Sequence, residues 1–223
     1  MPKKIFIIGD SWGVGAYKYA GNPPTSIEPI ENTGLDFFLK NDGFEVKNFS
    51  KSATNNLQQL ESLSITEESA DLIIWFHTEV TRDLLYKTGE GSTYSELSAY
   101  AIKRNFDLAE KIYADKNIPF IVIGCLSPVS DIINNYSFVK TVITSWLDDL
   151  TENKYKLPIS LHTNNFKDFF EKYNPSDYQF MTSEMDKMIY LETKLETHRA
   201  FSQGVHPSKD SFYKLAERVS CLL

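Results

Sequence analysis

Short apolar runs alternate along the chain with segments in which apolar residues recur three and four positions apart. The runs, most of them rich in β-branched residues, predict strands, and the wider spacing predicts helices. Strands and helices in alternation predict a mainly parallel sheet with helices on both faces, a three-layer α/β/α sandwich. The expected strands are residues 5–8, 43–49, 71–76 and 119–124, and the expected helices are residues 33–41, 54–63 and 97–115.

The pattern loosens beyond residue 128 and becomes regular again only near the end of the chain. No Gly/Ser-rich or charged linker sets residues 128–200 apart, so we expect them to be an insertion or cap on a single domain that covers residues 1–223. A helix capped by Ser208 should close the chain. The remaining expectations are a loop at 21–29, helices at 141–150 and 181–200, a short edge strand at 157–161 and an irregular aromatic segment at 166–180.

The first strand ends in Gly9-Asp10-Ser11-Trp12-Gly13, a run that predicts a tight turn into a helix. Such a turn places Ser11 at the carboxyl edge of the sheet, where open α/β folds bind their ligands. Two interpretations stay open at this point. Ser11 is a functional hydroxyl at that edge, or it only caps the helix that follows.

His206 lies in a loop directly before the closing helix, and Pro207 stiffens the backbone after it. The predicted topology brings this loop to the same edge of the sheet as Ser11. A serine hydroxyl is a weak nucleophile until a neighbouring base takes its proton, and histidine is suited to that task. The two residues are therefore a candidate catalytic pair; the alternative is a loop histidine without a catalytic role.

Residues 9–13 resemble the first sequence block of the SGNH (GDSL-type) hydrolases, in which the serine nucleophile follows the first strand. The run Gly204-Val205-His206-Pro207-Ser208 resembles their last block, and residues 48–55 and 76–79 fall where their second and third blocks lie. The resemblance covers most of the chain outside residues 128–200. It implies an SGNH/flavodoxin-like sandwich and a serine hydrolase, an esterase or carbohydrate O-deacetylase, that acts through a Ser11 acyl-enzyme with His206 as general base.

The same resemblance assigns the groups that would hold the oxyanion. One donor is the backbone N–H of Ser11, and a second is the N–H of Ala53, where the family has a glycine. The family's third donor is an asparagine side chain, but this chain has Glu79 there, and a carboxylate cannot donate a hydrogen bond. The family's triad acid lies three residues before the histidine, where this chain has the uncharged Gln203.

Two nearby charges are candidates to compensate. Glu79 is a candidate to orient His206 in place of the missing acid, and Arg82 is a candidate to pair with Glu79 or to bind a substrate carboxylate. The alternative is that Glu79, Arg82 and Asp83 form a solvated ion-pair cluster at the end of a strand.

Three more residues complete the candidate site. Asp10 and Trp12 flank the serine and are expected on the oxyanion and substrate side. His77 points toward the same edge if its strand continues to residue 78. Residues 9–13 also match the letters of the G-x-S-x-G elbow of α/β-hydrolases, but in that fold the serine follows several strands, and only one precedes Ser11. The run does not fit a dinucleotide loop either, because the G-x-G-x-x-G spacing is absent.

Composition limits the kinds of molecule that this protein is expected to bind. A formal net charge of −7 without any cluster of Lys or Arg makes nucleic acid an unexpected partner. The lack of an apolar run that could span a bilayer or form a signal-peptide core predicts a soluble, cytoplasmic protein with no membrane partner. No metal-ligand spacing or phosphate-binding loop is present, so neither a metal nor another cofactor is expected.

The residues and the resemblance leave two functions open. The first is an SGNH-type hydrolase of a small-molecule or glycan ester, with a degenerate triad. The second is a catalytically silent protein that keeps the fold as a binding or structural module, for instance in a virus particle. The departures at Glu79 and Gln203 prevent a choice between them, and the oligomeric state is open as well.

Overall fold

The computed structural model describes residues 2–21, 26–78, 83, 94–125, 129, 131–151, 200–202 and 206–223. Five strands form one parallel sheet in the order β4-β1-β5-β6-β7. These strands are β1 (Lys4–Ile8), β4 (Glu45–Asn48), β5 (Leu72–His77), β6 (Phe120–Gly124) and β7 (Val139–Ile143). The expected α/β class with a mainly parallel sheet is confirmed.

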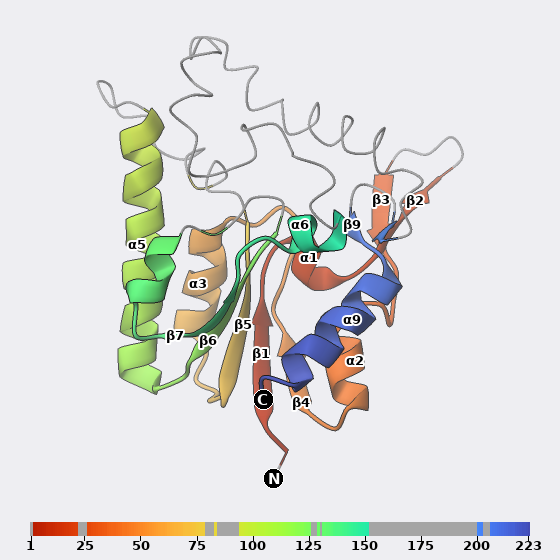
Figure 1. Cartoon of the computed structure of the whole chain (residues 1–223), viewed down its shortest axis with the longest axis horizontal. Helices are drawn as coiled ribbons and strands as arrows, with labels where there is room; N and C mark the ends of the chain where they lie inside the picture. Colours follow the sequence, from red (N-terminus) through yellow and green to blue (C-terminus); the bar gives the residue numbers. More distant parts are fainter. Residues whose placement is uncertain are drawn as a thin grey trace.

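Helices cover both faces of the sheet, as Figure 1 shows. One face carries α3 (Asn56–Ser64), α5 (Tyr94–Lys116) and the short 3₁₀ helix η1 (Asp131–Asn135). The other face carries α1 (Ser11–Val14), α2 (Leu35–Asn41), α6 (Trp146–Thr151) and α9 (Lys209–Ser220). The molecule is therefore a three-layer sandwich with one apolar core on each side of the sheet.

Strand β5 shows why the central strands are apolar throughout. All six of its residues are buried. Ile73 and Trp75 belong to the core under α3 and α5, whereas Ile74 and Phe76 belong to the core under α2 and α9. Because side chains alternate between the two faces of a strand, a sheet covered on both faces needs an apolar residue at every position.

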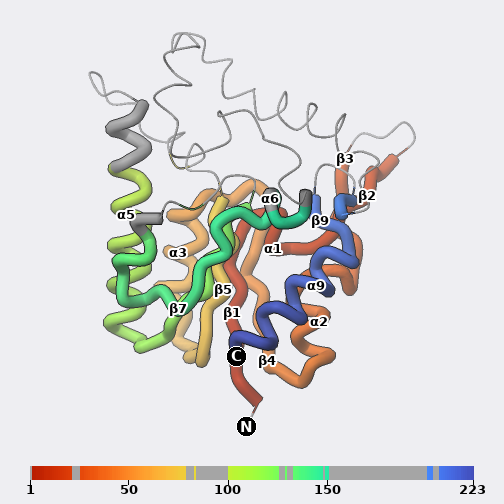
Figure 2. The backbone as a smooth tube through the Cα atoms, viewed as in Figure 1, coloured from red at the N-terminus to blue at the C-terminus, as the bar shows by residue number. Residues whose placement is uncertain are grey.

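The strand order reverses at the carboxyl edge of β1. The chain passes from β1 to β4 on one side of it and then to β5 on the other, so the connections diverge at this point. Open α/β sheets bind ligands where their strand order reverses in this way. Figure 2 shows α1 leaving this edge, with the C-terminal segment β9 (His206–Pro207) reaching the same end of the molecule.

The loop expected at residues 21–29 was wrong in part, because residues 26–29 form a strand. β2 (Tyr17–Ala20) and β3 (Ser26–Pro29) pair as an antiparallel hairpin. Each strand has only four residues, and β3 is exposed along its whole length. Such strands lack the alternation of buried and exposed residues that identifies a strand in a sequence.

The helix expected at 141–150 was also wrong in part. Residues 139–143 form strand β7 at the edge of the sheet, and a helix begins only at Trp146. Apolar residues at 143, 146, 147 and 150 lie three and four positions apart and imitate a helical pattern across the junction. The predicted Ser208 cap of the closing helix is confirmed, because Ser208 Oγ accepts the backbone N–H of Ser211.

The segment expected to be an insertion falls into two parts. Residues 131–151 add η1, β7 and α6 to the sheet and its covering layers. Residues 152–199 lie outside the described residues, and Ala200 is the first described residue after them. The strand, the aromatic segment and the helix expected at 157–200 therefore stay predictions, and so does the cap. None of the described helices is long and apolar enough to cross a membrane.

Candidate active site

Ser11 is the first residue of α1, immediately beyond the carboxyl end of β1. Asp10 caps this helix, because its Oδ1 accepts the backbone N–H of Trp12 at 2.9 Å. The interpretation in which Ser11 itself caps the helix is therefore wrong. Ser11 is half-buried.

The two glycines of this turn permit close packing around Ser11. A Cβ on Gly9 would lie 2.6 Å from Phe76 Cβ, and a Cβ on Gly13 would overlap the Ser50 hydroxyl. The turn is thus pressed between β5 and the segment after β4. Its packing explains why residues without side chains stand on both sides of Ser11.

Trp12 anchors the turn in the core. It is 2% exposed, and its ring packs edge-on against Trp146, with 5.7 Å between the ring centroids. The ring of Phe201 also lies near that of Trp12, with 6.5 Å between the centroids. The indole therefore lies under the serine turn, and a direct contact with substrate remains only a prediction.

The second oxygen of Asp10 begins a buried chain of hydrogen bonds. Asp10 Oδ2 accepts the hydroxyl of Thr78 at 2.8 Å. Asn56 then binds the backbone of Thr78 from both sides, accepting its N–H and donating to its carbonyl, each at 2.9 Å. All three residues are at most 1% exposed. The chain joins the ends of β1 and β5 to the start of α3 and fixes the cap of the serine helix.

Asp83 terminates this chain as a buried carboxylate. It accepts hydrogen bonds from Asn56 Nδ2 at 3.0 Å, Leu57 N at 3.1 Å and Asn105 Nδ2 at 2.9 Å, and Arg104 lies 3.8 Å away. Asp83 is 5% exposed. The expectation of a solvated ion-pair cluster is therefore wrong for this residue. Burial raises the pKa of Asp83, against the opposing effect of the bonds from Asn56 and Leu57.

The raised pKa of Asp83 gives a pH-dependent contribution to stability. Because the folded pKa lies above the ordinary value of 3.8, the folded state binds more protons than the unfolded state between these two values. The free energy of unfolding should therefore fall, relative to Asp83→Asn, as the pH rises from about 3.8 to the folded pKa, and stay level above it. Urea denaturation of both proteins across acidic pH measures the difference. A difference that grows in favour of the wild type over that window would contradict this assignment.

His206 lies in β9, and β9 contacts α1. The fold thus brings the element that carries His206 against the element that begins with Ser11, as expected. His206 is 3% exposed, and its ring stacks on Tyr17 with 3.9 Å between centroids. Ser202 Oγ donates to the His206 carbonyl at 3.0 Å and fixes the backbone of this segment.

Ala53 lies in the turn that follows β4 and adopts a left-handed conformation, with φ of 64°. This turn is tied to the serine turn, because Lys51 N and Thr54 Oγ1 both donate to the carbonyl of Gly9, at 3.0 and 3.2 Å. A side chain in the left-handed region is strained, whereas glycine is not. This strain is a physical reason for a glycine at this position.

Ala53→Gly is therefore expected to stabilise the protein. Relief of left-handed strain outweighs the added entropy of the unfolded chain, for a net gain of about 0.5–1 kcal/mol. Chemical denaturation measures the change. The matched control is Ala20→Gly in β2, where the backbone φ is not positive. This variant should lose a similar amount of folding free energy. A loss of stability in Ala53→Gly would contradict the strain.

His77 is the last residue of β5 and is 2% exposed. Its ring lies 5.0 Å from that of Trp75 and 6.0 Å from that of Phe106. These contacts place it on the α5 side of the sheet, within an aromatic cluster. A role at the substrate edge remains a prediction.

Three candidate residues lie outside the described part of the chain. These are Glu79, Arg82 and Gln203. Their proposed roles as substitute acid, charge partner and triad-position residue stay predictions. Within the described residues, no group of three or more His, Cys, Asp and Glu side chains has the arrangement of a metal site.

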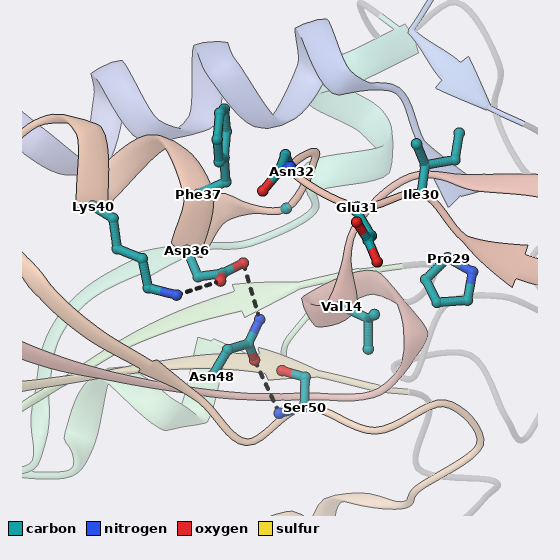
Figure 3. Close-up of a pocket in the computed structure, with 11 residues that line it drawn as sticks. Val14, Pro29, Ile30, Glu31, Asn32, Asp36, Phe37, Lys40, Asn48 and Ser50 are labelled. Carbon is teal, nitrogen blue, oxygen red and sulfur yellow. Dashed lines mark hydrogen bonds and ion pairs between the residues drawn. The ribbon is translucent and has the colours of Figure 1, made fainter.

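A cavity of about 430 Å³ opens on the α2 side of the serine helix (Figure 3). Lys40 and Asp36 form an ion pair at 3.0 Å in its wall, and Asn48 Nδ2 donates to the carbonyl of Gly13 at 2.8 Å. Ser50 N donates to Asn48 Oδ1 at 3.0 Å. Neither Ser11 nor His206 lines this cavity. The cavity is therefore separate from the candidate catalytic pair, although Asn48 in its lining holds the carbonyl of Gly13 in the serine turn.

Sequence reasoning missed the buried polar network and the tyrosine that stacks on His206. Asn56 lies in α3, Asn105 in α5 and Thr78 directly after β5, so no local motif connects them. One available signal was position, because Asn56 begins a helix and Thr78 follows a strand at the same edge of the sheet.

No family model matches this sequence. No curated protein sequence matches it either. Among solved structures, the chain superposes on a carbohydrate esterase described as having divergent catalytic and non-catalytic binding functions, with a TM-score of 0.50 and 11% identity over 97% of this chain. The match spans 63% of the length of that esterase. At this identity the likeness establishes the fold alone.

Two further solved structures give lower scores. A lipase/acylhydrolase from Enterococcus faecalis matches with a TM-score of 0.47 and 16% identity, covering 97% of this chain and 93% of that one. A protein described as lipolytic, of the G-D-S-L family, from Desulfitobacterium hafniense matches with a TM-score of 0.45 and 16% identity, covering 99% of each chain.

Proposed function

We propose that this protein is a serine hydrolase of carboxylic esters, an esterase or a carbohydrate O-deacetylase, with Ser11 as nucleophile and His206 as general base. The observation that supports this proposal best is the contact between α1 and β9, which carry the two residues. A substrate that is a small-molecule or glycan ester fits the chemistry of this pair. The carbohydrate esterase with the same fold is consistent with that class of substrate.

The proposed reaction proceeds through a covalent ester. Ser11 Oγ attacks the ester carbonyl while His206 takes the hydroxyl proton, and the tetrahedral intermediate then collapses with cleavage of the C–O bond. His206 returns the proton to the departing alcohol. Water, deprotonated by His206, hydrolyses the acyl-Ser11 ester and releases the carboxylic acid. No cofactor takes part in these steps.

Backbone donors are proposed to hold the oxyanion. The backbone N–H of Ser11 lies at the start of α1. The backbone N–H of Ala53 lies in a turn that is hydrogen-bonded to the carbonyl of Gly9. Each such donor typically contributes about 100- to 1,000-fold to turnover. A site with two donors in place of the family's three is therefore expected to be slower than a full SGNH site.

Hydrolysis of p-nitrophenyl acetate tests the proposal, with an acetylated xylan oligosaccharide as the glycan counterpart. We expect saturable release of p-nitrophenol with an initial burst close to the enzyme concentration, because p-nitrophenolate is a good leaving group and acylation of Ser11 is then faster than hydrolysis of the acyl-enzyme. Ser11→Ala should abolish the burst. The proposal would be contradicted if, between about pH 6 and pH 9, both substrates were hydrolysed no faster with the protein than in buffer alone.

One alternative has specific support in the sequence. Glu79 and Gln203 replace two polar groups of the SGNH pattern, which favours a catalytically silent protein that keeps the fold for binding. The assay above separates the two functions. If the protein is catalytically silent, calorimetry should detect binding of the acetylated oligosaccharide, and the assay should detect no hydrolysis.

Glu79 is proposed to replace the missing triad acid. Glu79→Gln should therefore lower kcat by roughly 100-fold or more, because it removes the charge that favours the imidazolium. Gln203→Asp in the Glu79→Gln background should not restore turnover. Steady-state kinetics of the two proteins measure both effects. A Glu79→Gln protein with the kcat of the wild type, together with a gain in kcat from Gln203→Asp, would discard the assignment of the acid to Glu79.

A further inference from the structure

The ring of Tyr17, the first residue of β2, lies face to face with the imidazole of His206. The centroids are 3.9 Å apart, the planes are inclined by 28°, and both side chains are buried. Imidazole nitrogens form hydrogen bonds in the plane of their ring, so the stack leaves their bonding directions clear. Tyr17 therefore fixes the plane of His206 without occupying either nitrogen.

Tyr17 is itself held at both ends. Its hydroxyl lies 2.5 Å from Ser52 Oγ, next to Ala53, and its backbone N–H donates to Ser202 Oγ at 3.0 Å. Ser202 Oγ also donates to the carbonyl of His206. One tyrosine thus joins the histidine segment to the turn that carries the proposed second oxyanion donor.

The stack also has an electrostatic consequence. The face of an aromatic ring carries negative potential and attracts a cation that lies over it. When His206 accepts the proton of Ser11, the imidazolium forms above this face. The residue three positions before His206 is the uncharged Gln203, so a contribution from the ring matters more here than in a triad with an acid at that position.

We propose that Tyr17 is a positioning residue for His206, whose ring fixes the imidazole plane and whose face stabilises the imidazolium formed during catalysis. This inference rests on the proposed function. From the strength of cation–π contacts, loss of the ring face should disfavour the imidazolium about 3- to 30-fold.

The Tyr17 variants leave the other ionisable groups around His206 in the sequence unchanged. α1, β8 (Phe201–Ser202) and β2 pack against β9, and they bring Asp10 at the cap of α1 together with Tyr17. Lys18 of β2 is exposed, as are the charged residues 209 and 210 that open α9. Burial raises the pKa of Tyr17, Asp10 adds to the rise, and the bond with Ser52 opposes it, so the phenol is neutral near pH 7.

An NMR titration of the His206 ring tests the proposal, with His206→Gln identifying its signal. Tyr17→Phe keeps the ring face and should leave the pKa of His206 close to that of the wild type. Tyr17→Leu should lower this pKa by about 0.5–1.5. Pentafluorophenylalanine at position 17 keeps the shape of the ring but reverses the sign of the potential on its face, so it should also lower the pKa of His206. This variant keeps the test available if the leucine variant fails to fold. Tyr19→Leu, on the same strand, is the exposed control.

Kinetics on p-nitrophenyl acetate provide a second readout. Tyr17→Leu should lower kcat about 3- to 30-fold with KM unchanged, and Tyr17→Phe should stay within about threefold of the wild type. An unchanged His206 pKa in the pentafluorophenylalanine protein would overturn the proposal. So would a phenylalanine variant with a pKa as low as that of the leucine variant. Because the titration needs no turnover, an inactive protein with the expected pKa order refutes the hydrolase proposal and not the stack.

Discussion

Ser11→Ala is expected to lower kcat/KM for p-nitrophenyl acetate by roughly 1,000-fold or more. The hydroxyl forms the covalent bond in the proposed reaction, and alanine leaves the oxyanion donors in place without a nucleophile. Ser64→Ala, at an exposed serine near the end of α3, is the matched control and should keep full activity. Steady-state kinetics at several enzyme concentrations measure the difference.

His206→Gln should cost about as much as Ser11→Ala, because the hydroxyl is a poor nucleophile without a base. Residues that act as one unit give non-additive losses, so the double variant should be no slower than either single variant. A His206→Gln protein that keeps more than about a tenth of the wild-type rate would show that His206 is not the base.

Asp83→Ala is expected to lower the free energy of unfolding by about 3 kcal/mol. The substitution leaves three donors, from Asn56, Leu57 and Asn105, without the carboxylate that now accepts them in a buried site. Urea denaturation near pH 7 measures the loss. A change below about 1 kcal/mol would mean that the network contributes little to stability.

Asp107→Ala is the control for Asp83→Ala. Asp107 is also a carboxylate, and it pairs with Lys103 on the exposed surface of α5. Exposed pairs of this kind contribute about 0.2–1 kcal/mol. The contrast between the two variants therefore isolates the effect of burial from the loss of a charge.

Elements with a strong local pattern were predictable from the sequence. Strand β5 is apolar at nearly every position, and α9 carries its cap at Ser208 and a regular apolar stripe. The hairpin of β2 and β3 was missed because β3 is exposed along its whole length and Tyr17 is the one buried residue of β2. Strand β7 was missed because its apolar residues join those of α6 in a helical spacing.

In the candidate site too, some features could be predicted from the sequence and others could not. Ser11 and His206 could be proposed from the sequence because each lies in a short motif of neighbouring residues. The stack of Tyr17 on His206 and the bond between Thr78 and Asp10 could not, because they join residues from distant parts of the chain. Such contacts depend on how the elements pack, and one sequence carries little signal for them.

Labelling with a fluorophosphonate tests most directly whether Ser11 is a nucleophile activated by His206. Mass spectrometry of the digested protein should place one phosphonyl adduct on Ser11, and the labelling rate should fall by about 100-fold or more in His206→Gln. No adduct between about pH 6 and pH 9, or an adduct that forms at the same rate without His206, would contradict the proposed mechanism.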